Sequence, residues 1–390
     1  MDIATQQFAL KHRSDDLHRL LLQQSAYPGI DIPAAVTQIE GWTIARNKIP
    51  SWATNDAILY PPRLAMEQCS SELTARYKAS IVSGIRMTDL TGGFGVDSSF
   101  MSERFNDVTY VERNEQLFAI SSANFESLGL TNIHPVCGDG RNALSTLPHQ
   151  NWIYLDPARR DTAGHKTVAL ADCEPDVSMM EEELLAHANN ILVKCSPMLD
   201  ISLACTQLRH VQEVHVVAVK GECKELLLVL NNADIKPSEV PITCIDLPEG
   251  KPFTFTREEE DTCGCPFQQP GRYIYEPNAA LLKAGCFRLP ATRFGLQKLH
   301  PNTHLYTSDV LYTDFPGRIF EVIHTCGFSK RELRSALGEL QCANITVRNF
   351  PQSVDTLRRR LHLAEGGDNY LFATTIGKGE HRLIRCRKVQ

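Results

Sequence analysis

Short apolar runs alternate with amphipathic stretches between residue 86 and about residue 230. Short runs rich in Val, Ile, Leu and aromatic residues are typical of buried strands, and apolar residues at helical spacing indicate helices between them. The predicted strands cover 86–90, 107–112, 133–136, 151–156, 190–195, 213–219 and 225–230, and the predicted helices cover 96–105, 114–129, 139–144, 178–188 and 200–210. This alternation predicts an α/β fold with a parallel sheet. The last two strands are separated only by a short link, so we expect them to pair antiparallel.

The patterns on either side of this region differ from it. Residues 1–80 look mainly helical, and they should form a segment that either covers a ligand or only packs. A Pro-rich, charged stretch at 231–272 reads as an excursion or linker. The last part of the chain follows β-α-β-α-β-β order, as in a small α/β domain. The predicted domains are therefore 1–80, 81–272, 273–317 and 318–390.

Helix-capping residues support several of these helices. Ser71 is placed to cap a helix in 71–84, and Ser353 is placed to cap one in 353–363. Ser329 with Glu332 forms a capping-box pattern before an apolar run.

Composition narrows the class of protein. A chain of 390 residues exceeds one ordinary core, so two or three domains are expected. Thirteen scattered cysteines fit a reducing compartment, and no apolar run is long enough to span a bilayer. These features predict a soluble cytoplasmic protein without a membrane partner. Cys263, Cys265 and Cys286 could suggest a metal site, but no second close pair completes a zinc set, so free thiols and no metal are expected.

The charge is unevenly distributed. Residues 318–390 carry 13 Lys and Arg against 7 Asp and Glu, a net of +6. The whole chain carries 40 and 46, so the remaining residues hold 27 and 39, a net of −12. A basic end on an acidic body suggests a polyanion contact, although a solvated basic surface explains the composition equally well.

The stretch MTDLTGGFGVDSS, residues 87–99, reads as a strand end, a glycine turn and a helix start. Glycines permit a tight turn and close approach of a ligand to the backbone. In an open α/β sheet, ligands bind beyond the carboxyl ends of the strands. Polar residues follow four successive predicted strands there, namely Asp89 with Thr91, Gly92, Gly93 and Gly95; Glu112; Asp139 with Gly140; and Asp156 with Pro157, Arg159 and Arg160.

The ordered motifs DLTGGFG, VE, CGDG and LDPARR resemble those of class I S-adenosylmethionine (SAM) dependent methyltransferases. Together with EQCSSELTARYKA, KCSPMLDI and GECKELL, they resemble one bacterial family that also carries a ferredoxin-like piece and a THUMP-like domain. The resemblance implies a Rossmann-like methyltransferase sheet with an antiparallel final hairpin. It implies that Gly92, Gly93 and Gly95 back SAM, that Glu112 holds its ribose and that Asp139 holds its adenine amine. THUMP modules bind structured RNA, so the resemblance points to RNA as the partner.

The Asp156-Pro157 turn suits an amine nucleophile, because the carboxylate and a carbonyl near Pro157 can accept its two protons. Related enzymes that act on exocyclic amines often carry a second proline and an aromatic residue next, where this chain has Ala158 and Arg159. A guanidinium there could stack on a base, grip a phosphate, bind a carboxylate of a protein or small molecule, or only pair with nearby acidic residues. The target atom therefore stays open.

Several alternatives remain. Glu112 could be a solvated strand end, and Asp139 could be a helix cap. A dinucleotide oxidoreductase is a rival class, but Ser98 replaces the third glycine of its fingerprint. An RNA-binding protein without catalysis would keep the fold but would not need the strand-end carboxylates.

Overall fold

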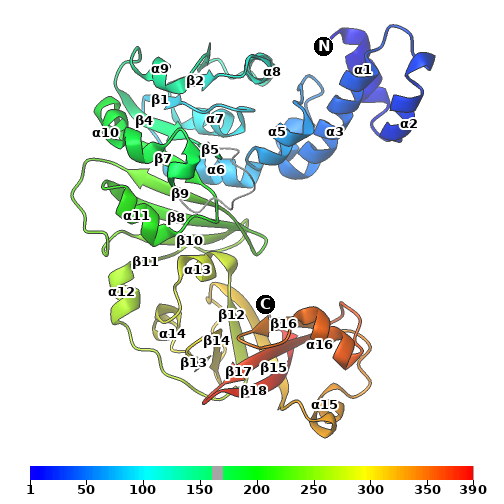
Figure 1. Ribbon diagram of the computed structural model, residues 1–390, viewed down its shortest axis with the longest axis vertical. Helices are drawn as coiled ribbons and strands as arrows, with labels where there is room; N and C mark the ends of the chain where they lie inside the picture. Colours follow the sequence, from blue (N-terminus) through cyan, green and yellow to red (C-terminus); the bar gives the residue numbers. More distant parts are fainter. Residues whose placement is uncertain (160–169, 390) are drawn as a thin grey trace. The chain divides into compact units, whose positions relative to one another are not determined.

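The computed structural model describes residues 1–159 and 170–389 (Figure 1). The chain divides into two compact units. The first contains residues 1–212 and 226–234, and the second contains residues 213–225 and the chain from residue 235 onward. None of the described helices combines the length and apolar character needed to cross a membrane.

The first unit begins with helices, as the sequence predicts. They are α1 (Ile3–Lys11), α2 (Leu17–Leu22), α3 (Ile32–Lys48), α4 (Pro50–Ala53), α5 (Arg63–Gln68) and α6 (Glu72–Ile81), with a 3₁₀ turn at Gln24–Ala26. Ser71 caps α6 by accepting the Thr74 N–H, which confirms the predicted cap. The longest of these helices, α3, lies in the segment predicted to be mainly helical, but its own bounds were not predicted. Its signal is Asp31, which caps the helix, followed by Pro33 in the first turn.

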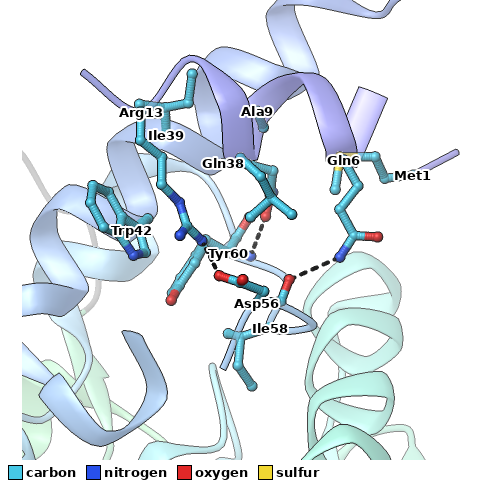
Figure 2. A pocket seen from close by; sticks show the side chains of 11 residues that line it. Met1, Gln6, Ala9, Arg13, Gln38, Ile39, Trp42, Asp56, Ile58 and Tyr60 are labelled. Atoms are coloured by element: carbon cyan, nitrogen blue, oxygen red, sulfur yellow. Dashed lines mark hydrogen bonds and ion pairs between the residues drawn. The ribbon is translucent and has the colours of Figure 1, made fainter. Parts of the chain in front are cut away.

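A small cavity lies among these helices (Figure 2). Arg13 stacks 4.4 Å from the ring centre of Trp42 and pairs with Asp56 at 2.9 Å. Gln38 binds both backbone groups of Tyr60 at 2.8 Å. The cavity has about 20 Å³, which is room for roughly one water molecule, so this region is packed rather than hollow.

The predicted alternation of strands and helices is confirmed. The strands are β1 (Arg86–Asp89), β2 (Asp107–Glu112), β3 (Ile133–Cys137), β4 (Gln150–Leu155), β7 (Ala188–Cys195), β8 (Val211–Val219) and β9 (Glu222–Leu230), with a short ribbon of β5 (Ala158–Arg159) and β6 (Cys173–Glu174). The helices are α7 (Val96–Met101), α8 (Glu115–Ser127), α9 (Gly140–Leu144), α10 (Val177–His187) and α11 (Ile201–Gln207), with 3₁₀ turns at Ser102–Arg104 and Leu170–Asp172.

The sheet has the order β11-β10-β8-β9-β7-β4-β1-β2-β3. Strands β3, β2, β1, β4 and β7 are parallel, so their carboxyl ends lie at one edge. Strands β8 and β9, joined by a short turn, are neighbours in the sheet, as the predicted final hairpin requires, and β9 runs antiparallel to β7. The edge where the parallel strands end carries the predicted site residues.

The prediction that residues 231–272 form an excursion or linker is wrong. The chain instead forms β10 (Ile242–Leu247), β11 (Phe253–Phe255) and α12 (Arg257–Thr262). Strand β10 pairs parallel with β8, and β11 pairs antiparallel with β10. Burial of apolar side chains such as Ile242, Cys244 and Phe255 outweighs the Pro-rich local composition.

The second unit also contains a seven-stranded sheet, in the order β13-β14-β12-β15-β18-β17-β16. Its elements are β12 (Tyr273–Pro277), α13 (Ala279–Ala284), α14 (Leu289–Arg293), β13 (Gln297–His300), β14 (Thr303–Ser308), β15 (Gly317–Cys326), α15 (Lys330–Leu337), β16 (Asn344–Arg348), α16 (Val354–Leu361), β17 (Asn369–Ile376) and β18 (Glu380–Lys388). The β-α-β-α-β-β order predicted from residue 318 is confirmed. The capping box of Ser329 with Glu332 and the cap by Ser353 are confirmed as well.

Candidate active site

The loop between β1 and α7 comes very close to neighbouring groups. A Cβ added at Gly92 would lie 2.2 Å from the Tyr110 ring, so only glycine fits there. Gly95 has φ +77° where it starts α7, a conformation that glycine adopts without strain. Beside Gly93, by contrast, a Cβ would meet nothing closer than 3.8 Å. The loop is therefore tightly packed on one side and has room on the other.

Glu112, at the end of β2, holds this loop in place. Its Oε2 accepts the Gly93 N–H at 2.7 Å, and its Oε1 accepts the Asn114 N–H at 2.6 Å. The side chain is only 9% exposed. A carboxylate oxygen can accept two hydrogen bonds, so Glu112 can still receive hydroxyl donors.

Asp89, at the end of β1, is buried inside the loop. Its carboxylate accepts the Thr91 N–H at 2.9 Å and the Ser98 hydroxyl. Burial raises the pKa of Asp89 to about 7, and the negative charges of Asp97 and Asp156 add to this effect. The hydrogen bonds oppose the shift, because they stabilise the ionised form.

Asp156 follows β4 and is tied to the same loop. Its N–H donates to Thr91 Oγ1 at 2.6 Å. Its Oδ2 accepts from Lys194 Nζ at 2.6 Å, and Lys194 comes from the end of β7. The Asp156 side chain is 37% exposed, so it faces solvent at the sheet edge beside the glycine loop.

A buried network lies behind the loop. Asp97, in the first turn of α7, accepts the hydroxyls of Ser70 and Tyr154 at 2.7 Å, and Lys78 Nζ lies 3.2 Å from its Oδ1. Burial alone would raise the pKa of Asp97, but Lys78 and Lys194, helped by these hydrogen bonds, hold it below its ordinary value. Sequence reasoning did not assign a role to Asp97 or Lys78. The only feature of the sequence that points to them is that each is a charged residue on an otherwise apolar helix face.

Asp139 caps α9, because its Oδ1 accepts the N–H groups of Arg141 and Asn142 at 3.0 and 3.1 Å. The helix-cap alternative is thus what the structure shows, and the contact of Asp139 with adenine stays a prediction. A Cβ at Gly140 would lie 2.3 Å from the Leu90 carbonyl oxygen. This close approach brings the α9 end next to the glycine loop.

The Asp-Pro turn leads from β4 into the β5–β6 ribbon. Ala158 and Arg159 pair through their backbones with Glu174 and Cys173. Glu174 accepts from Arg113, the residue after Glu112, at 2.8 Å. Nothing is described of the Arg159 side chain, and Arg160 lies outside the described residues.

One set of hydrogen bonds therefore joins the ends of β1, β2 and β4. Asp156 binds Thr91, Thr91 binds Asp89, and Gly93 binds Glu112. These predicted residues come together in the first unit. Their roles toward a ligand stay predictions.

Comparison with known proteins gives the family. A crystal structure of a "putative methyltransferase" from Porphyromonas gingivalis W83 is 38% identical, covers 100% of this chain and 98% of its own, and superposes with a TM-score of 0.90. This chain belongs to the same methyltransferase family. Two proteins of Mycobacterium tuberculosis, from strains CDC 1551 / Oshkosh and ATCC 25618 / H37Rv, are 27% identical over 81% of this chain and 84% of their own. Both are named "Uncharacterized S-adenosylmethionine-dependent methyltransferase".

Two family models match the C-terminal part of this methyltransferase. A ferredoxin-like domain matches residues 273–316, and a THUMP domain-like model matches residues 317–388. The chain is thus a class I SAM-dependent methyltransferase with these two C-terminal domains, and the oxidoreductase alternative falls away.

The residues at the sheet edge fit SAM. The open side of Gly93 leaves room for a ligand, and the negatively charged Glu112 carboxylate binds the Gly93 N–H there. Such charge favours a ligand that carries a sulfonium and an ammonium group. The charge of the residues at this edge is therefore compatible with SAM.

Proposed function

We propose that this methyltransferase methylates a base of structured RNA at an amine nitrogen. The observation that carries the RNA part is the THUMP domain-like match at residues 317–388, because THUMP modules in other enzymes bind structured RNA. The thirteen free cysteines fit a reducing cytoplasm.

Charge on the THUMP-like domain supports an RNA partner. Lys330, Arg331 and Arg334 are exposed on α15, and none of the carboxylates in the described part of the chain pairs with them. Cations that are not neutralised by the protein can bind phosphates and release counterions.

In the cofactor site, we assign the glycines Gly92, Gly93 and Gly95 to the methionine and ribose side of SAM. Glu112 accepts the ribose hydroxyls, and Asp139 with Gly140 lies at the adenine end. Asp89 and Thr91 shape the loop through the contacts between them and with Asp156. When bound, SAM supplies an electrophilic methyl group on sulfur.

The acceptor side consists of Asp156 and Pro157. The Asp156 carboxylate and a backbone carbonyl beside Pro157 accept the two amine protons, so the nitrogen lone pair points at the methyl group. With SAM bound, the nitrogen would displace the methyl group from sulfur, which would keep the electrons of the broken S–C bond. The methylated nitrogen then loses one proton to the Asp156 carboxylate, which passes it to water. Arg159 and Arg160 are assigned to the substrate base or phosphate.

Transfer of labelled methyl from SAM to a fractionated cell extract tests this proposal. We expect label in the RNA fraction, recovered after digestion as an N-methylated nucleoside. Asp156→Asn should lower transfer by about 100-fold or more, with SAM binding by calorimetry little changed. Asp234→Asn, a change at an exposed carboxylate away from the site, serves as the matched control.

The outcomes separate the parts of the proposal. Label in the protein or small-molecule fraction would show that the substrate class is wrong. Label in RNA as an O-methyl or C-methyl nucleoside would overturn the amine assignment and leave RNA in place.

A further inference from the structure

Lys194 makes a contact with Asp156 that the proposed chemistry does not yet use. The Lys194 side chain is 13% exposed, and its ammonium lies 2.6 Å from Asp156 Oδ2. Within residues 1–159 and 170–389, the other oxygen, Oδ1, accepts no hydrogen bond from the protein. One oxygen of the carboxylate is thus occupied by Lys194, and the side chain as a whole is 37% exposed.

Strand register explains why these two residues meet. Leu155 of β4 is the partner of Val193 of β7 in the parallel ladder, so Asp156 and Lys194 are the next residues on neighbouring strands. The Asp156 backbone is fixed separately, because its N–H donates to Thr91 Oγ1. The carboxylate is therefore held at its backbone and at one oxygen.

We propose that Lys194 is a positioning residue for methyl transfer, which holds Asp156 Oδ2 so that Oδ1 points at the substrate amine. This inference rests on the proposed function. A carboxylate without that contact could rotate and turn either oxygen inward, which would misplace the amine protons. Because reaction rates depend steeply on such alignment, one fixed oxygen raises the rate without adding a contact to SAM.

If Lys194 only neutralised a buried carboxylate, we would expect its side chain to be fully buried. The buried Asp97 already has Lys78 at 3.2 Å, and Lys78 is fully buried whereas Lys194 reaches solvent. Lys194 also stabilises the negative charge of Asp97, while Asp97 and Asp156 both act on the buried Asp89. Its position directly after Val193 of β7, beside the partly exposed Asp156, suits a group that acts on that carboxylate.

A double-mutant cycle on the full chain tests the inference, with labelled methyl transfer to whichever fraction accepts it. We expect Lys194→Met to lower kcat by about 10- to 100-fold and to leave the SAM dissociation constant within about twofold. In an Asp156→Asn background the same change should alter kcat by less than about twofold, because the group through which Lys194 acts is already lost. Lys194→Arg, which keeps a cation, should recover most of the rate.

Lys236→Met is the matched control, because Lys236 also pairs with a carboxylate, Glu239 at 2.9 Å, but on the surface. Thermal unfolding of each variant checks the fold. If Lys194→Met lowered kcat by the same factor in the wild-type and Asp156→Asn backgrounds, the inference would be overturned. A weaker affinity of Lys194→Met for SAM would overturn it as well. Label in a fraction other than RNA would defeat the proposed substrate, while the cycle on that acceptor would still decide the role of Lys194.

Discussion

Asp89 is a carboxylate enclosed by its own loop. Only 1% of the residue is exposed, and its hydrogen-bond donors come from Thr91 and Ser98. Because its pKa is about 7 in the folded protein and 3.8 ordinarily, the folded state keeps its proton over a range in which the unfolded chain has lost it. The contribution of Asp89 to stability is thus full below about pH 4 and is lost as pH rises to about 7.

The direction of this pKa shift predicts how the stability of the protein changes with pH. Between pH 5 and pH 8, without SAM, the melting temperature of the wild type should fall relative to that of Asp89→Asn, because the amide does not ionise. Thermal unfolding across this range measures the difference. Asp234→Asn, at an exposed position, should run parallel to the wild type. Parallel curves for Asp89→Asn as well would contradict the raised pKa.

The sequence predicts which residues meet at the site only where they lie at the ends of strands. Glu112 and Asp156 follow apolar strands directly, so the parallel sheet had to bring them to one edge. The hydrogen bond from Gly93 to Glu112 and the pair of Lys194 with Asp156 depend on strand register and loop shape. Such pairings need the three-dimensional arrangement, because no local pattern specifies them.

At the scale of elements, the Asp97 network ties α6, α7 and β4 together. Ser70 and Lys78 come from the N-terminal segment, Asp97 from the helix after the glycine loop, and Tyr154 from two residues before Asp156. The Trp52 and Phe94 rings add an apolar contact, with their centres 5.1 Å apart. The N-terminal segment therefore packs against the glycine loop.

Loss of the Asp97 charge should be costly. Asp97→Asn removes the carboxylate that Lys78 contacts, and breaking a buried ion pair costs about 3–5 kcal/mol. Ser70→Ala removes the hydrogen bond of Ser70 to the same carboxylate and the one that Lys78 donates to Ser70, and should cost about 1–2 kcal/mol. Urea unfolding followed by circular dichroism should show a much larger midpoint shift for Asp97→Asn. Equal shifts would mean that the charge of Asp97 contributes little.

Elements with a strong local period were predicted, and elements held by neighbours were not. Apolar runs such as 190–195 specify a buried strand by themselves. Strands β10 and β11 lie in Pro-rich sequence, and they form because their ladder partners and buried side chains outweigh weak local preference.

At the scale of the whole molecule, acidic and basic character belong to different parts of the chain. The excess of +6 in residues 318–390 contrasts with −12 in the remainder. An acidic methyltransferase part suits a cationic cofactor, and a basic THUMP-like part suits a polyanion.

Charge reversal on α15 tests that division. Arg331→Glu with Arg334→Glu should weaken RNA binding and reduce the slope of log affinity against log salt by about 2, because two phosphate contacts are lost. SAM affinity should not change. Lys11→Glu with Arg19→Glu makes the same change of charge on exposed N-terminal helices and should have little effect. Filter binding at several salt concentrations gives the slope. Equal weakening by both double variants would indicate a response to net charge alone.

The path of the chain limits how the protein can be divided. The chain leaves the first unit after Gln212 and returns for Leu226–Asp234, where β9 completes the ladder beside β7. A fragment that ends at Gln212 would keep the glycine loop and Asp156 yet leave a bare β7 edge, which invites self-association. Any truncation or gene fusion that aims to transplant the transferase module therefore has to include β9, so that the edge of β7 stays paired.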